Sequence, residues 1–376
     1  MGKMKKSMLS IVWLTVFSLA LGAAWTTKRL SNNDGYSAHP DLAVNSLNVF
    51  AVWSDDTTGN AEIYFRKSVD GGATWQAEKL LTNNAGNSCN PSIALKGAEL
   101  YVVWDDDTSG NNEIYFRKSI DAGASWQASK RLTNTAGFSD TAKIAVNGSN
   151  VYVAWNDNTP GTADIYFKRS ADGGSTWQAT KKITNNAGTS IRPDMACDSS
   201  SVYLVWYDNT TGNYEIYFRK SVDNGSTWQT AQQLTNSAGN SDYPHIAVGG
   251  SNVYVVWDDE TTGNLEIYFR KSTNGGSTWQ TEKRLTFNSG QSSNPILARS
   301  GVNLYVAWTD GTPGNSEVYF RKSADGGSTW QSSKRLTNNL GYSAAENMAV
   351  NSTNVYVICS DNDPGNSEIY LKYSPL

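Results

Sequence analysis

Tryptophan returns along this chain at a constant spacing of 51 residues, without insertion or deletion. The first series stands at Trp53, Trp104, Trp155, Trp206, Trp257 and Trp308, and Cys359 takes the seventh place. The second series stands at Trp75, Trp126, Trp177, Trp228, Trp279 and Trp330. A fixed period of this length indicates one small structural unit repeated in an array or a ring, in which each unit buries its apolar face against the next.

Each unit contains four short segments with β-strand composition, shown in the fifth unit by "PHIAV", "NVYVVW", "EIYFRKS" and "WQTEKRLT". The second segment is apolar without alternation, which in a strand means that both faces are covered. Helical periodicity is nowhere sustained. The sequence therefore predicts an all-β protein, a seven-bladed β-propeller with four-stranded antiparallel blades of 51 residues.

The two ends of the chain predict how the ring closes. Residues 25–30 match the fourth strand of a unit, whereas the chain stops after the third strand of its last unit. We expect residues 25–30 to complete the last blade as its outer strand, pairing with residues near 367–373. Such closure leaves no open sheet edge.

Residues 1–24 have the features of a secretory signal peptide, with three lysines, an apolar run and small residues before Trp25. We expect residues 25–376 to form a single, secreted or extracytoplasmic domain, monomeric and without membrane insertion. The formal net charge of −4 and the lack of a basic run give no reason to expect nucleic-acid binding. Cys89, Cys197 and Cys359 occupy different places in the repeat, so it predicts no disulfide between them.

An eight-residue motif, "SADGGSTW" at 323–330, recurs with small changes between the third and fourth segments of six units. Its glycines suit a tight turn, and its acidic residue can accept backbone N–H bonds inside that turn. The fifth unit has Asn in this place, which keeps an acceptor oxygen but loses the charge, so we interpret these residues as structural. They are Asp70, Asp121, Asp172, Asp223, Asn274 and Asp325.

The pattern S-x-D-x-G-x-T-W is the Asp box, and the chain resembles the sialidase-like (BNR-repeat) propeller superfamily over all seven units. In sialidases three arginines hold the substrate carboxylate, a Tyr with a Glu partner is the nucleophile, and an Asp is the acid/base. Only Arg192 and Arg299 stand outside the repeat, and Arg192 lies one residue, not two, before a proline. In a regular strand that offset turns its side chain to the opposite face.

Topology places the segments leading into the first strands on the same face as the acidic hairpins such as 55–62. An open ring of these carboxylates would repel an anionic sugar. We expect hydrogen bonds within the hairpins to hold them instead.

In a ring of near-identical units, the residues outside the repeat are the candidates for function. At the mouth of the central channel they are His39, Asn90, Asp140, Arg192, Asp242, Tyr243, His245 and Glu346. The functional interpretation is a polar pocket in which the two histidines transfer protons or bind metal. The alternative is a permissive, solvated position where sequence varies freely. The histidines lack the paired spacing of a zinc site, so we expect no metal.

The sequence favours a binding module for glycans or cell-surface proteins, without an evident catalytic centre. An exo-α-sialidase or another glycoside hydrolase of the superfamily is the alternative, and a structural envelope protein is the second. We expect no cofactor. The Asp-rich stretch 105–113 leaves calcium open, although it lacks the spacing of an EF-hand loop.

Overall fold

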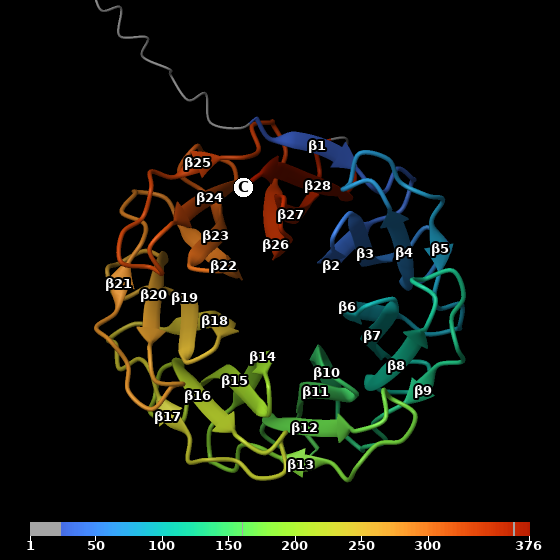
Figure 1. The fold of residues 1–376 in the computed structure, drawn as a ribbon, viewed down its shortest axis with the longest axis horizontal. Helices are drawn as coiled ribbons and strands as arrows, with labels where there is room; N and C mark the ends of the chain where they lie inside the picture. The colour runs from blue at the N-terminus through green and yellow to red at the C-terminus, as the bar shows by residue number, and fades with distance from the viewer. Residues whose placement is uncertain (1–23, 160, 364) are drawn as a thin grey trace, which may run out of the picture.

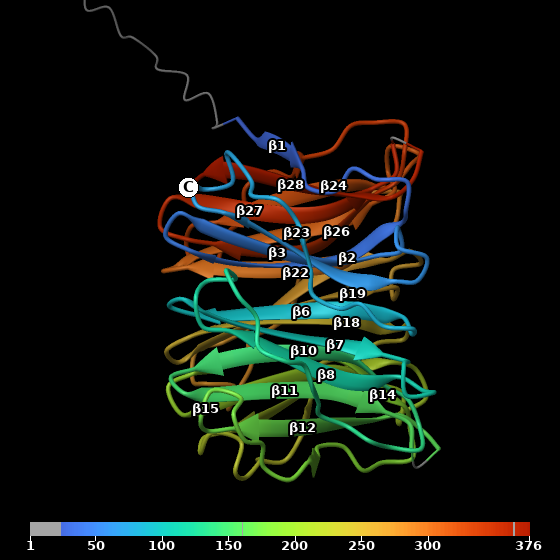
Figure 2. The same ribbon diagram turned by 90° about the vertical axis from the view of Figure 1, so that its right-hand side faces the viewer.

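The computed structural model describes residues 24–159, 161–363 and 365–376, and the proposed signal peptide therefore falls almost wholly outside the described residues. Seven four-stranded antiparallel sheets surround a central channel like the blades of a wheel (Figure 1). Seen from the side, the strands form a short cylinder with hairpins at both ends (Figure 2). The predicted seven-bladed propeller is confirmed.

Every blade runs from an inner strand at the channel to an outer strand at the rim. The inner strands are β2 (Ser37–Asn45), β6 (Ser88–Lys96), β10 (Ser139–Asn147), β14 (Ser190–Asp198), β18 (Ser241–Gly249), β22 (Ser292–Ser300) and β26 (Ser343–Val350). The second strands are β3 (Asn48–Asp55), β7 (Glu99–Asp106), β11 (Asn150–Asp157), β15 (Ser201–Asp208), β19 (Asn252–Asp259), β23 (Asn303–Asp310) and β27 (Asn354–Asp361).

The third strands are β4 (Glu62–Ser68), β8 (Glu113–Ser119), β12 (Asp164–Ser170), β16 (Glu215–Ser221), β20 (Glu266–Ser272), β24 (Glu317–Ser323) and β28 (Glu368–Pro375). The outer strands are β5 (Lys79–Leu80), β9 (Lys130–Arg131), β13 (Lys181–Lys182), β17 (Gln232–Gln233), β21 (Lys283–Arg284), β25 (Lys334–Arg335) and, in blade seven, β1 (Thr26–Arg29).

The core lies between the blades, and the second strands supply most of it. In blade one, every residue of β3 after Asn48 is buried, as the unalternating apolar segment predicts. Trp53 stacks on Tyr64 of the next strand at a ring distance of 6.0 Å. The Asp-box tryptophan of each of blades two to six packs edge-on against a phenylalanine of the preceding blade, as Trp126 does on Phe65 at 5.2 Å. The repeat therefore joins blade to blade with the same aromatic contact.

The ring closes as the sequence predicts, because β1 pairs antiparallel with β28 from Thr26↔Tyr373 to Arg29↔Tyr370. Trp25 also packs edge-on against Phe320 of blade six at 5.0 Å. It thereby takes the part of the Asp-box tryptophan that blade seven lacks.

The outer strands are shorter than the eight-residue segment in the sequence, with only two paired residues in six blades. In blade one the residues before the outer strand are held by a side chain, because the Arg66 Nε donates to the Gln76 carbonyl at 2.9 Å. A guanidinium thus satisfies a carbonyl that a longer strand would satisfy with backbone.

The Asp-box acid is bonded entirely within its own turn. Asp70 accepts hydrogen bonds from the Thr74 N–H at 2.8 Å, from the Thr74 hydroxyl and from the Ser68 hydroxyl at 2.8 Å. These bonds lower the pKa of Asp70 to about 2. Asn274 bonds to the same partners, accepting from the Thr278 N–H and the Ser272 hydroxyl at 2.9 Å each and donating through Nδ2 to the Thr278 hydroxyl at 2.8 Å. The turn thus forms with or without the charge.

Candidate functional site

The inner strands of blades one to six carry a β-bulge where they reach the channel mouth. In blade four the register shifts between Ile191 and Asp194, and Arg192 adopts a left-handed φ of 50°. The same place has positive φ in the other five blades, at His39, Asn90, Thr141, Tyr243 and Asn294. A bulge redirects a side chain, so two residues that alternation would send to opposite faces can both reach the channel.

A cavity of about 410 Å³ opens at this end of the channel, lined by residues from all seven blades. Six of the eight predicted channel-mouth residues line it: His39, Asn90, Arg192, Tyr243, His245 and Glu346. Arg192 does so although a regular strand would turn it away, because the bulge interrupts the alternation.

The other two predicted residues, Asp140 and Asp242, do not line the cavity. Each stands one residue before the positive-φ position of its bulge, and each pairs with a residue of the second strand of its own blade. Asp140 accepts a hydrogen bond from Asn156 Nδ2, and Asp242 lies opposite Asp258 in the ladder. Burial raises the pKa of Asp242 to about 6.

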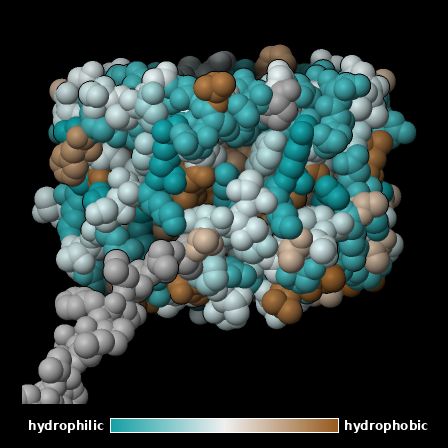
Figure 3. Space-filling view, turned by 90° about the horizontal axis from the view of Figure 1, so that it is seen from above, coloured by the Kyte–Doolittle hydropathy of each residue, from teal (hydrophilic) through white to brown (hydrophobic). Residues whose placement is uncertain are grey.

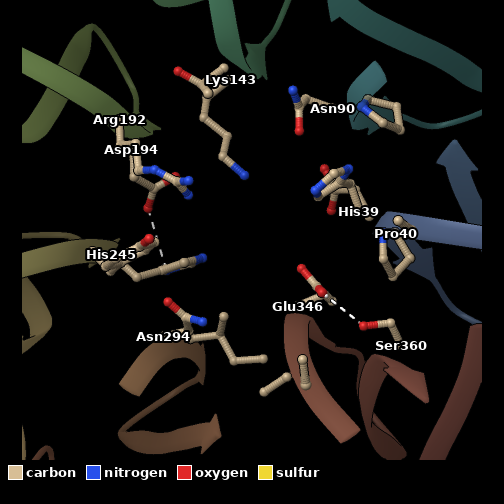
Figure 4. A pocket seen from close by; sticks show the side chains of 18 of the residues that line it. His39, Pro40, Asn90, Lys143, Arg192, Asp194, His245, Asn294, Glu346 and Ser360 are labelled. Carbon is tan, nitrogen blue, oxygen red and sulfur yellow. Dashed lines mark hydrogen bonds and ion pairs between the residues drawn. The ribbon is translucent and has the colours of Figure 1, made fainter. Parts of the chain in front are cut away.

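Lys143 is the cation among the cavity residues that the sequence analysis missed, which also include Tyr36, Asp41, Thr141, Asp194, Asn294 and Tyr342. It extends toward the centre of the cavity from β10, and Glu346 extends toward the centre from β26 (Figure 4). Within the described residues, its ammonium group has no hydrogen bond or ion pair. The sequence did contain a signal for Lys143, because this position varies between the blades. The aligned residues of the other six blades all differ from Lys143, and only an aspartate occurs twice among them. They are Asp41, Ser92, Asp194, His245, Ile296 and Asn347.

Arg192 is the second cation of the cavity. Its guanidinium lies over the ring of Tyr243 at 4.5 Å from the centroid and has no ion pair among the described residues. The stacked contact holds the guanidinium plane against the wall, with its donors still available to a ligand.

Glu346 is a partly buried carboxyl on the cavity wall. Burial raises its pKa to about 7, against smaller opposing effects of the hydrogen bond from Ser360 Oγ at 3.0 Å and of Lys143 and Arg192. Near neutral pH it is therefore about half protonated.

The two histidines face the same cavity from blades one and five (Figure 4). Desolvation inside the channel lowers the pKa of both, and Arg192 and Lys143 lower that of His39, whose side chain is exposed at the mouth, further. His245 Nδ1 lies 3.4 Å from Asp194 Oδ2, which also accepts the Ile246 N–H at 2.8 Å. At neutral pH both imidazoles are uncharged. The part of the chain that the structure describes contains no group of three or more His, Cys, Asp or Glu side chains arranged to hold a metal ion.

The acidic hairpins on this face do not form an open anionic ring. Asp55 is fully buried, and it accepts hydrogen bonds from Asn33 Nδ2 at 2.8 Å, Ser37 Oγ at 2.5 Å and the Thr57 N–H at 2.9 Å. The equivalent carboxylates of the other blades are buried as well. The charges that reach the cavity are therefore those outside the repeat.

Two further cavities lie in the grooves between blades, with volumes of about 540 and 610 Å³. They occupy equivalent positions two repeats apart. One has Tyr166 and Lys168 in its wall, and the other has Tyr268 and Arg270. The side of the rim seen in Figure 3 is mostly hydrophilic, with separate hydrophobic side chains rather than one continuous patch.

All three cysteines are free. Cys359 is buried in the core between blades six and seven, and Cys197 packs at the edge of the core between blades three and four. Within the described residues, no helix has the length and apolarity to cross a lipid bilayer.

No protein-family model and no curated protein matches the sequence. Solved structures match it in fold. The polysaccharide lyase Uly1 has a TM-score of 0.59 and 9% identity, over 89% of each chain. The GH93 α-L-arabinofuranosidase of Fusarium graminearum has a TM-score of 0.54 and 14% identity, over 76% of this chain and 92% of that one.

A Trypanosoma rangeli sialidase has a TM-score of 0.54 and 11% identity, over 93% of this chain and 58% of that one. These matches confirm the predicted resemblance to sialidase-like propellers at the level of fold.

Proposed function

We propose that this protein is a carbohydrate-binding propeller that holds an acidic sugar at the channel mouth and does not cleave it. The observation that carries the proposal is the pair of cations, Lys143 and Arg192, that face one cavity and form no direct ion pair among the described residues. The carboxylates of Asp41 and Asp194 line the same cavity, but each accepts a backbone N–H hydrogen bond from a neighbouring blade. Two positive charges that share a cavity attract an anion, and a ligand carboxylate or sulfate would accept charge-assisted hydrogen bonds from both.

The fold supports a carbohydrate ligand. The solved structures that share it include a polysaccharide lyase, an arabinofuranosidase and sialidases. Fold alone does not assign a function, so the chemistry of the cavity decides the ligand class. Aromatic walls, amide side chains and two cations suit the apolar faces, hydroxyls and acidic group of an acidic sugar.

Binding without cleavage is favoured because the sialidase constellation is incomplete. Of the arginines in the described residues, only Arg192 lines the cavity. Arg299, the other arginine outside the repeat, donates instead to the carbonyls of Val248 and Gly301. No hydrogen bond joins a tyrosine of the cavity to Glu346 within the described residues, although desolvation and the nearby Glu346 carboxylate both raise the pKa of Tyr342. The missing arginines therefore carry the argument against a sialidase.

A glycoside hydrolase is the second candidate, and Glu346 is the observation in its favour. A carboxyl whose pKa is raised to about 7 can act as a general acid at neutral pH. A hydrolase also needs a second carboxylate at a suitable separation from the first.

The test is affinity electrophoresis through gels that contain polygalacturonate, alginate, hyaluronan or heparin, with neutral xylan and laminarin as references. The proposal expects retardation by at least one acidic polymer, lost in Lys143→Met and Arg192→Ala. Lys96→Met is the matched control, because it removes an exposed lysine on the opposite face. Retardation by none of the acidic polymers would refute the proposal. Release of sialic acid from a fluorogenic sialoside, or of new polysaccharide chain ends, lost in Glu346→Gln, would establish the hydrolase instead.

A further inference from the structure

The aromatic residues at the channel mouth fall into two groups from opposite sides of the ring. One group is Tyr36 of blade one and Tyr342 of blade seven, which both line the cavity. The other group comes from blades four and five and is built around Tyr243. Because the ring has seven blades, the junction of blades seven and one faces blade four across the channel (Figure 1).

Tyr36 and Tyr342 are exposed, with 59% and 48% of their surface open to solvent. Their backbones are fixed, because the Tyr36 N–H donates to Asp56 Oδ1 and the Tyr342 N–H to Asn362 Oδ1, each at 2.6 Å. An exposed aromatic ring on a fixed backbone is a preorganised surface for a ligand. The same place in the other blades holds Asn87, Phe138, Thr189, Asn240 and Gln291, so adjacent tyrosines occur only at the junction of blades seven and one.

The group across the channel is a continuous aromatic cluster. The ring of Tyr243 lies 6.0 Å from that of Tyr207, and Tyr207 packs edge-on against Tyr214 at 5.0 Å. The Arg192 guanidinium covers the Tyr243 ring, and both of these residues line the cavity. This side therefore presents to the cavity a guanidinium that an aromatic ring holds in place.

The sides of the cavity between the two groups contain no tyrosine among the lining residues. Blades two, three and six present Asn90, Thr141 and Asn294 there, beside prolines and small aliphatic side chains. The tyrosines of the mouth thus follow one diameter of the ring, with Lys143 and Glu346 near its centre (Figure 4).

We propose that the ligand is an extended acidic glycan that lies across the mouth along this diameter. An internal sugar residue occupies the central cavity, and its neighbours stack on Tyr36 and Tyr342 on one side and on the Arg192–Tyr243 surface on the other. The inference rests on the proposed function and deepens it from an acidic sugar to a polymer bound along its length. A chain end seated in a closed pocket is the arrangement that it excludes.

The experiment measures affinity against chain length by isothermal titration calorimetry. The probes are oligomers of one, two, four and six residues, prepared from whichever of polygalacturonate, alginate, hyaluronan or heparin retards the protein most. The wild type is compared with the double variant Tyr36→Ala/Tyr342→Ala. Phe138→Ala is the matched control, because Phe138 is 52% exposed at the same place of blade three but does not line the cavity.

The proposal expects the hexamer to bind at least about tenfold more tightly than the dimer, since each stacked aromatic ring adds to the affinity. It expects the double variant to lose most of that gain, while Phe138→Ala keeps it. The substituted side chains are exposed, and an unchanged melting temperature verifies that the variants are folded.

A dimer that binds as tightly as the hexamer would overturn this inference and leave the proposed function standing. A double variant that keeps the whole gain in affinity from dimer to hexamer would also overturn this inference and leave the proposed function standing. Absence of binding to every acidic polymer would overturn both.

Discussion

Replacing Glu346 by Gln should stabilise the protein above neutral pH. Burial raises the pKa of this carboxyl to about 7 from an ordinary 4.5. A pKa difference of one between the folded and unfolded protein corresponds to about 1.4 kcal/mol, so ionising Glu346 in the folded protein costs on the order of 3 kcal/mol. Glutamine fills nearly the same volume and can still accept the hydrogen bond from Ser360.

The expected pH dependence follows from the direction in which burial moves this pKa. Because the folded state holds the Glu346 proton more tightly than the unfolded state, the free energy of unfolding falls as pH rises from about 4.5 to about 7 and then levels off. In Glu346→Gln this contribution to the fall in the free energy of unfolding with pH is absent. At about 2.1 cal/mol/K of unfolding entropy per residue, 3 kcal/mol in a chain of 376 residues is about 4 °C in melting temperature.

The assay is thermal and urea unfolding of the wild type and the variant at pH 5 and pH 8.5. Asp105→Asn is the matched control, because burial raises the pKa of Asp105 to about 7 as well, although Asp105 does not line the cavity. Both variants should lose less stability than the wild type at high pH, but only Glu346→Gln should change the pH dependence of acidic-glycan binding. A Glu346→Gln protein that loses as much stability as the wild type between the two pH values would refute the reasoning.

Three further predictions concern the ring itself. Asp70→Asn should leave the melting temperature close to that of the wild type, because Asn274 supports the same turn in blade five. Asp70→Ala should lower the melting temperature, and equal losses in the two variants would contradict the structural role. Trp25→Ala should lower stability by about 1–3 kcal/mol in urea unfolding, because the edge-on contact with Phe320 is lost where the ring closes, and an unchanged midpoint would show that β1 holds blade seven alone. The native protein should react slowly with Ellman's reagent at pH 8 and yield three thiols after denaturation, since burial raises the pKa of the Cys359 thiol to about 12; rapid native reaction of all three would contradict the burial.

The architecture was predictable because each repeat unit contains the local sequence signals for its own strands and turns. The apolar second segment, the tight turn and the Trp spacing each report on a local or nearest-neighbour contact, so they can be interpreted without coordinates. The closure by residues 25–30 followed from counting segments, and the pairing of β1 (Thr26–Arg29) with β28 agrees. The short outer strands were not predictable, because β-type composition indicates a strand but does not fix how many of its residues pair.

The candidate site was only partly predictable, because a bulge at the channel mouth breaks the alternation of the strand. Arg192 and Pro193 both line the cavity, although strict alternation would send these neighbours to opposite faces. Lys143 was missed for a related reason, since its contribution depends on how far a long side chain reaches into a channel that seven blades share. Asp140 and Asp242 differ between blades yet face their own second strands, so variation alone did not identify the lining.

The number of ligand molecules per chain tests the central claim most directly. If the residues outside the repeat create the site, calorimetric titration with an acidic hexasaccharide should give one site per chain, and Lys143→Met should abolish it. A stoichiometry near seven would show that the ligand binds in the repeated grooves between the blades. An affinity that is unchanged in Lys143→Met would show that the channel mouth does not bind it.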